Sequence, residues 1–377
     1  MKGSIKKRGK TYSVRYDAGI HPETGKRNQK SKGGFQNRKD AERFLTEKLF
    51  ELNSDNFFLP QKEYFKPFLL DWFETKYKKN VSIRTWEGRE YMLHKHLIPK
   101  FAHYKLQDIT TYELDAFYAN KVESGLSPKT VKDLHNLMNL CLSQAVKWGY
   151  LKYNPARDAS PPRLVEKEIQ TWDYDTARLF LHVAKKEGKD AFYTVAVFTG
   201  MRRGELLGLK WADVNFKQKK LYIQRSLSYT KSEGYLLKNT KTSKSKRQIS
   251  ISTQIVEALI EHRKKQNELK EMLREGYEDL DLVFPNQFGG FKNPDNLRRE
   301  FNGLVQKAKV HRITIHGLRH THATWLLKNG INPKVVSERL GHNDVSITLK
   351  TYSHVSSDLQ EEAADKLEES YNEWTSK

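Results

Sequence analysis

Cysteine is almost absent from this sequence, and the signals of secretion or membrane insertion are missing. The 377 residues include one cysteine, Cys141, which excludes an internal disulfide and any zinc site with two or more cysteine ligands. The cysteine count does not exclude a metal site built from histidines and carboxylates. No stretch reaches the ~18 consecutive apolar residues of a membrane span, and the basic amino terminus lacks the apolar run of a signal peptide. We therefore expect a cytoplasmic protein without membrane contact.

Acidic residues are also in short supply. The chain has 67 Lys and Arg against 46 Asp and Glu, a net charge of +21, which favours a polyanionic partner, and nucleic acid above a membrane surface. The hydrophobic fraction is a low 37%, but 11% of the residues are aromatic, which argues against disorder. The length predicts two or three domains, each with its own core.

Residues 1–56 are predicted to form a small DNA-binding domain of strands plus a helix. Fourteen basic side chains oppose five acidic ones in residues 1–50. Tyr12, Val14 and Tyr16 alternate with polar residues, which indicates a half-buried strand, and a turn at 21–25 leads to a second basic strand, 26–32.

A helix beginning at Asn37 or Arg38 has the apolar spacing needed to cover this sheet. A β-ribbon with a charged outer face can enter a DNA major groove, whereas a solvated basic tail would not explain the alternation. The side chains expected to contact DNA are Arg15, Lys26, Arg27, Lys30 and Lys32.

Residues 60–153 are predicted to form a helical domain. Ser127 and Pro128 supply a helix start, and Gly149 supplies a helix end. Cys141 lies on an apolar stripe, so we interpret it as core packing. Four such stripes at helical spacing predict four helices, within residues 65–73, 86–97, 114–118 and 131–145.

A stretch rich in proline and charge, 154–170, is interpreted as an interdomain linker. The last domain is then 171–377. It is predicted to begin with helices near Asp175 and Lys189, to contain strands near 221–227 and 247–251, and to be helical from there to its end.

Separated segments of this last domain carry the residue types that attack on a phosphodiester needs. Two guanidiniums can hold the non-bridging oxygens. A tyrosine hydroxyl can attack phosphorus if a histidine accepts its proton, and a lysine can protonate the leaving alkoxide. Each segment is weak evidence alone, because a lone His-x-x-Arg or a basic hairpin is common on protein surfaces. The segments lie at 199–205, 240–242, 316–320, 340–342 and 351–354.

In this order, the segments resemble the tyrosine recombinase family of phage and transposon integrases. The motifs are Thr-Gly-x-Arg-x-Gly-Glu, Lys-Thr, His-x-Leu-Arg-His, Leu-Gly-His and Thr-Tyr-Ser-His. The resemblance implies that Tyr352 is the nucleophile and forms a 3′-phosphotyrosyl bond. It also implies roles for six further residues. Arg202 and Arg319 would clamp the phosphate, and Lys241 would be the general acid. His316 and His342 would assist proton transfer, and Glu205 would orient the first segment.

The general acid is the least certain of these residues, because Lys244 and Lys246 lie close to Lys241 and hairpin registers slip. The resemblance implies no cofactor, neither metal nor ATP, because the phosphotyrosyl bond keeps the energy of the broken phosphodiester. It further implies a mainly α catalytic domain with a small antiparallel sheet, a core-site-binding domain at 60–153 and an arm-site-binding domain at 1–56. The expected partners are double-stranded DNA at core and arm attachment sites, three further protomers in a tetramer, and an accessory DNA-bending or excision factor.

The carboxyl-terminal tail has a different character. Residues 357–377 contain seven acidic and two basic side chains, which is unsuited to DNA. An apolar stripe at mostly i+4 spacing includes Leu367, Tyr371 and Trp374. We interpret the tail as a docking helix, which binds either a neighbouring protomer or its own chain.

The sequence therefore predicts a site-specific DNA integrase. One alternative is a type IB topoisomerase, which uses the same chemistry without joining partners. Another is a DNA-binding regulator that does not cleave.

Overall fold

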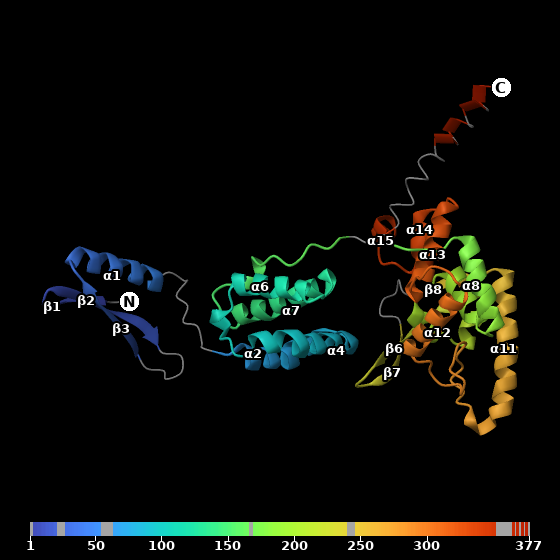
Figure 1. The fold of residues 1–377 in the computed structure, drawn as a ribbon, viewed down its shortest axis with the longest axis horizontal. Coiled ribbons are helices and arrows are strands. Elements are labelled where there is room, and N and C mark those ends of the chain that lie inside the picture. The colour runs from blue at the N-terminus through green and yellow to red at the C-terminus, as the bar shows by residue number, and fades with distance from the viewer. Residues whose placement is uncertain are drawn as a thin grey trace. The chain divides into compact units, whose positions relative to one another are not determined.

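The computed structural model describes residues 3–20, 27–53, 63–165, 169–239 and 246–351, and four short pieces, 364–365, 367–368, 371–372 and 374–375. The chain divides into two compact units, Met1–Val165 and Glu166–Lys377 (Figure 1). Among the described residues, no helix has the length and apolar character needed to cross a membrane.

The amino-terminal segment forms a three-stranded antiparallel sheet with α1 across one face (Figure 1). Asn37 begins the helix, because its Oδ1 accepts the amide of Asp40 at 2.8 Å. Two strands were predicted and are confirmed; the first strand was not predicted, since Ile5 is its one apolar side chain and no alternation shows. The elements are β1 (Gly3–Arg8), β2 (Thr11–Ile20), β3 (Arg27–Phe35) and α1 (Arg38–Asn53).

Residues 63–153 contain the four predicted helical runs. The first two runs each include a π-helical turn, at Phe73–Tyr77 and Leu93–Leu97. Cys141 is fully buried among the apolar side chains of this domain, which confirms its packing role. The runs are α2 (Phe65–Trp72) with α3 (Lys78–Asn80), α4 (Ile83–Met92) with α5 (Ile98–Phe101), α6 (Thr111–Glu123) and α7 (Pro128–Lys147).

The start of the expected linker packs on this helical domain. Asn154 donates from Nδ2 to the Asn139 side chain at 2.7 Å and to Ser143 at 2.8 Å. Ala156 and Ala159 are buried in the same core. Proline prevents a helix here, but it does not prevent packing, so composition alone placed the linker too early.

The second unit is mainly helical with two small antiparallel sheets. One sheet has the strand order β4-β5-β8, and the other is the β6-β7 hairpin. Strands β4 and β7 were not predicted, and the single strand expected near 221–227 is divided between β5 and β6, which lie in different sheets. The strands are β4 (Val214–Asn215), β5 (Lys220–Ile223), β6 (Arg225–Thr230), β7 (Gly234–Asn239) and β8 (Arg247–Ser250). The helices are α8 (Tyr174–Lys186), α9 (Asp190–Thr199), α10 (Arg203–Leu207), α11 (Thr253–Leu273), α12 (Pro294–Lys307), α13 (Ile315–Lys328), α14 (Pro333–Leu340) and α15 (Val345–Thr351).

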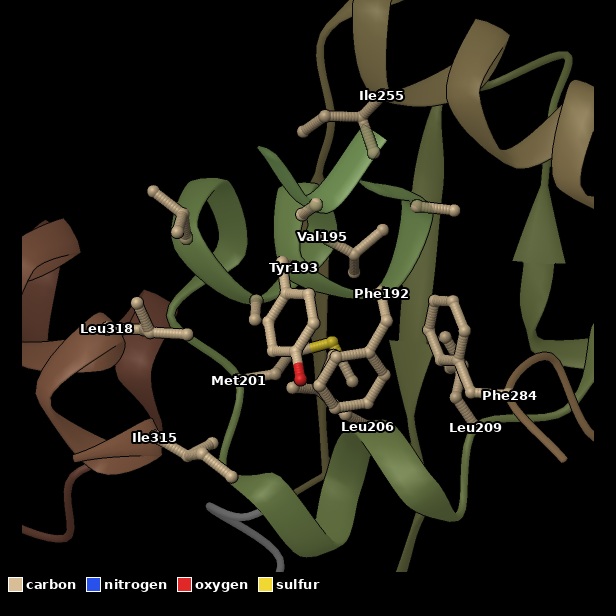
Figure 2. Close-up of a cluster of buried hydrophobic side chains, with 14 of the residues drawn as sticks. Phe192, Tyr193, Val195, Met201, Leu206, Leu209, Ile255, Phe284, Ile315 and Leu318 are labelled. Atoms are coloured by element: carbon tan, nitrogen blue, oxygen red, sulfur yellow. The ribbon is translucent and has the colours of Figure 1, made fainter. Parts of the chain in front are cut away.

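The apolar core of this unit anchors the segments that carry the sequence motifs. Figure 2 shows Ile315 and Leu318 of α13 pointing toward the cluster that contains Met201 and Leu206. These four side chains are at least nine-tenths buried. Because they flank the motif residues of α10 and α13 in sequence, their packing fixes where those polar side chains emerge.

Candidate active site

The first motif contains a tight turn at a glycine. Helix α9 ends at Gly200, which has φ 64° and lies in the left-handed region. A Cβ there would stand 2.7 Å from both His322 Cδ2 and Leu340 Cδ2. The turn thus brings α9 against α13 and α14, and it leaves Arg202 extended at the start of α10.

Glu205 holds Arg202 through both its backbone and its side chain. The Arg202 amide donates to Glu205 Oε2 at 2.8 Å, and Arg202 Nη1 donates to Oε1 at 2.9 Å. Arg202 Nη2 also donates to the carbonyl of Gly341 at 2.9 Å. The Glu205 side chain is 3% exposed and that of Arg202 is 38% exposed, so Arg202 is anchored on one side and accessible on the other.

The charge of Glu205 is maintained by two arginines. Burial alone would raise the pKa of its carboxyl, but the hydrogen bond and charge of Arg247, with a smaller contribution from Arg202, lower the pKa below its ordinary value. Glu205 is therefore ionised at neutral pH, as the predicted orienting role requires.

The third motif lies in the first two turns of α13. Thr314 caps this helix by accepting the amide of Gly317 at 3.0 Å. Arg319 is 2% exposed, and its Nη1 donates to the carbonyl of Gly200 at 2.9 Å. That contact ties Arg319 to the turn that precedes Arg202. His316 lies one turn earlier on the exposed side of the helix.

His342 follows the left-handed Gly341 that ends α14, and its Nδ1 lies 2.8 Å from Thr348 Oγ1. Burial, followed by the charges of Arg319 and Arg202, lowers the pKa of His342 to about 4. Loss of hydration, then His320 and the same two arginines, lowers that of His316 to about 4. Both rings are therefore neutral at pH 7 and share one cationic environment.

The structure thus brings together Arg202, Glu205, His316, Arg319 and His342 from three separated segments. Lys241 and Tyr352 lie outside the described residues, as does the alternative Lys244. The other alternative, Lys246, is exposed and lines a pocket of about 410 Å³ together with Arg247, Gly341 and His342.

Sequence reasoning missed Arg247, although it contacts this site directly. It stands in a basic run with Lys244 and Lys246, where nonspecific phosphate contact is the simpler interpretation. The one available signal is its position at the start of a predicted strand that ends in the apolar pair Ile249 and Ile251.

The five predicted DNA contacts of the amino-terminal domain do not share one face. Arg15 lies on the open face of the sheet, and Arg27 pairs with Asp17 on that face at 2.6 Å. Lys30 is opposite Tyr16 and Lys32 is opposite Val14, which turns both toward the α1 side.

A ring contact supports this orientation, since Lys32 Nζ stands 4.7 Å from the ring centroid of Phe44 on α1. Lys26 lies outside the described residues. The open face also carries Lys6 opposite Ser13 and Arg8 opposite Thr11. Sequence reasoning missed both because it missed their strand.

Three segments match known family models. Residues 173–358 match the phage integrase family, residues 64–122 match the phage integrase N-terminal SAM-like domain, and residues 4–51 match an arm DNA-binding domain.

Individual proteins are similar over most of the chain. A tyrosine recombinase XerC-like protein of Caldanaerobacter subterraneus is 32% identical over 270 residues, which cover 67% of this chain and 68% of the relative. The ICEBs1 integrase of Bacillus subtilis is 27% identical over 286 residues, or 75% of this chain and 77% of the relative. The fold is similar to that of the Tn1549 transposon integrase in complex with a circular intermediate DNA, with a TM-score of 0.69, 21% identity, and coverage of 80% of this chain and 98% of that one.

Proposed function

This chain belongs to the tyrosine recombinase family of phage and mobile-element integrases, and we propose that it cleaves and rejoins DNA through Tyr352. It is a site-specific recombinase that exchanges DNA strands. One observation supports the residue assignment: Arg202, Arg319 and His342 lie in one positively charged site, in which Glu205 holds Arg202. This family membership favours an integrase over a relaxing topoisomerase or a regulator that does not cleave.

Cleavage begins when the Tyr352 hydroxyl attacks the scissile phosphorus. The new bond joins the tyrosine oxygen to the 3′ phosphate, and the bond to the 5′ oxygen breaks. Arg202 and Arg319 hold the non-bridging oxygens, where negative charge accumulates. Rejoining reverses these steps with the 5′ hydroxyl of a partner strand as the nucleophile.

Proton transfer divides between the histidines and a lysine. His316 and His342 are neutral at pH 7, so each can accept a proton or donate an N–H hydrogen bond. They assist removal of the tyrosine proton and stabilise the charged transition state. Lys241 delivers the proton that the 5′ oxygen takes up as it leaves.

The amino-terminal sheet supplies the second contact with DNA. We assign arm-site contact to its open face, which carries Arg15 and Arg27 together with Lys6 and Arg8. Lys30 and Lys32, on the α1 side, serve as phosphate contacts at the edge of the domain. The helical domain at 60–153 binds the core site next to the cleaved bond.

The acidic tail serves assembly rather than DNA binding. The described residues of the tail are helical, and the side chains of Leu367, Tyr371 and Trp374 are exposed. An apolar stripe of this kind favours a protein partner. We assign it to docking within a homotetramer on DNA, where it binds a neighbouring protomer or its own. Deleting residues 359–377 should reduce assembly on DNA; unchanged assembly would contradict docking between protomers.

A suicide substrate tests the nucleophile. Its core site is obtained by selecting a random duplex library for binding and covalent capture by the full-length protein, and a nick then traps the cleaved strand. The wild type should form a covalent protein–DNA complex, and Tyr352→Phe should bind the duplex without forming it. Covalent product with Tyr352→Phe would refute the assignment, and no product with the wild type would favour a regulator.

A further inference from the structure

Arg247 is a buried cation in contact with the site, and no step of the proposed reaction uses it. Its side chain is 7% exposed. Nη1 and Nη2 donate to the two oxygens of Glu205 at 3.1 Å and 2.8 Å, and Nε donates to the carbonyl of Arg339 at 2.8 Å. Each guanidinium nitrogen thus donates to an acceptor within the protein, which fixes the orientation of this side chain.

Glu205 is shared between two arginines, and this sharing determines the position of Arg202. Each carboxylate oxygen accepts one hydrogen bond from Arg247 and one from Arg202. Without Arg247, the carboxylate would be free to turn fully toward Arg202. The resulting bidentate pair would draw the Arg202 guanidinium inward, away from the accessible side where a phosphate would bind.

Arg247 also packs against the turn that leads to His342. Gly341 has φ 68°, and a Cβ added there would stand 2.9 Å from Arg247 Nη1. The carbonyl of the same Gly341 accepts Arg202 Nη2 at 2.9 Å. One buried guanidinium therefore contacts the carboxylate behind Arg202, the turn beside it and the end of α14.

Stability alone does not explain why a charged group occupies this place. Replacing a buried ion pair by apolar residues of similar volume is often neutral or stabilising. We propose that Arg247 is a positioning residue for strand cleavage, which engages Glu205 and supports the 340–342 turn so that Arg202 faces the scissile phosphate. This proposal rests on the proposed clamp role of Arg202.

The test compares two substrates that differ only in charge. One suicide duplex carries the ordinary scissile phosphodiester, and the other carries a methylphosphonate there, in which a methyl group replaces one non-bridging oxygen and removes the negative charge. A guanidinium that balances the negative charge of the phosphate contributes far less to cleavage of the neutral substrate. Single-turnover cleavage is measured at saturating full-length protein, so that DNA binding does not limit the rate.

Arg247→Met should cleave the phosphodiester about 10- to 100-fold more slowly than the wild type, the size of effect expected when a catalytic group is misplaced by about 1 Å. Its deficit on the methylphosphonate should be several-fold smaller, and Arg202→Ala should show the same pattern. Arg247→Lys keeps the charge but loses the forked geometry, so it should fall between Arg247→Met and the wild type.

Arg225 provides a matched control in the same unit. It forms an ion pair with the buried Asp213 at 2.5 Å. Among the described residues, neither Arg225 nor Asp213 forms a hydrogen bond with Glu205 or Arg247. Arg225→Met should cleave both substrates at the wild-type rate while it remains folded. Equal loss by Arg247→Met on both substrates, or wild-type cleavage of the phosphodiester, would overturn the positioning role. Failure of the wild type itself to cleave would instead refute the proposed function.

Discussion

Replacing Glu205 with glutamine removes one negative charge from a buried site and keeps its shape. The amide retains one acceptor oxygen, but its NH₂ group would face donors of Arg202 or Arg247, which now lie 2.8 to 3.1 Å from the carboxylate. Breaking a buried ion pair costs about 3–5 kcal/mol. Because Arg202 is partly exposed and regains water, we expect a loss near the lower end, about 3 kcal/mol. In a unit of about 200 residues this lowers Tm by about 6–12 °C.

Calorimetry of the full-length protein measures this loss, and Asp213→Asn provides the comparison. Asp213 is also buried and paired with an arginine, so its variant should lower Tm of the same transition by a similar amount. Well below both transitions, Glu205→Gln should cleave the suicide duplex more slowly and Asp213→Asn should cleave it normally. If Glu205→Gln kept both its Tm and its cleavage rate, the bridge between the two arginines would have no energetic role, and Glu205 would not determine the position of Arg202.

Two further predictions concern residues around the site. Burial and the charge of Arg339 lower the pKa of His322 to about 3 in the folded protein. The unfolded chain therefore takes up a proton first as pH falls below about 6.5, and folding stability should decline by up to about 1.4 kcal/mol per pH unit down to the folded pKa. His322→Gln should flatten this decline in thermal melts recorded from pH 7 to pH 4, and an unchanged slope would contradict the lowered pKa. Gly341→Ala should lower both Tm and the cleavage rate, since it adds left-handed backbone strain and a close contact with Arg247. Gly330 has φ 71° with open space around it, so Gly330→Ala should lower Tm alone. Equal cleavage rates for the two variants would show that the contact with Arg247 has no effect on cleavage.

Sequence patterns predicted most of the helices because apolar stripes repeat over several turns. The runs that begin at Phe65 and Pro128 bury such stripes. Strands β1 and β7 were missed for the opposite reason. β1 has one apolar side chain, Ile5, and β7 pairs with β6 in a hairpin outside the main sheet, so neither shows a clear period of two.

The chemical groups of the site could be predicted from motifs, but their mutual support could not. The contact of Arg202 with Gly341 spans 139 residues of chain, and that of Arg247 with Glu205 spans 42. The only local signal that separates Arg247 from the lysines before it is its place at the start of a predicted strand, and that signal does not say which way its side chain points. Only the fold shows that Lys246 and Gln248 are exposed while the side chain of Arg247 is buried.

The cations that would hold phosphate also contribute, after burial, to keeping His316 and His342 neutral. After burial, the charges of Arg202 and Arg319 contribute to the lowered pKa of both His316 and His342. A phosphate bound between these arginines would bring negative charge that opposes their effect, so we expect both pKa values to rise when DNA binds. The histidines would therefore become better proton acceptors when the substrate is in place. On this view the arginines act twice, once on the phosphate directly and once by coupling the basicity of the two rings to its arrival.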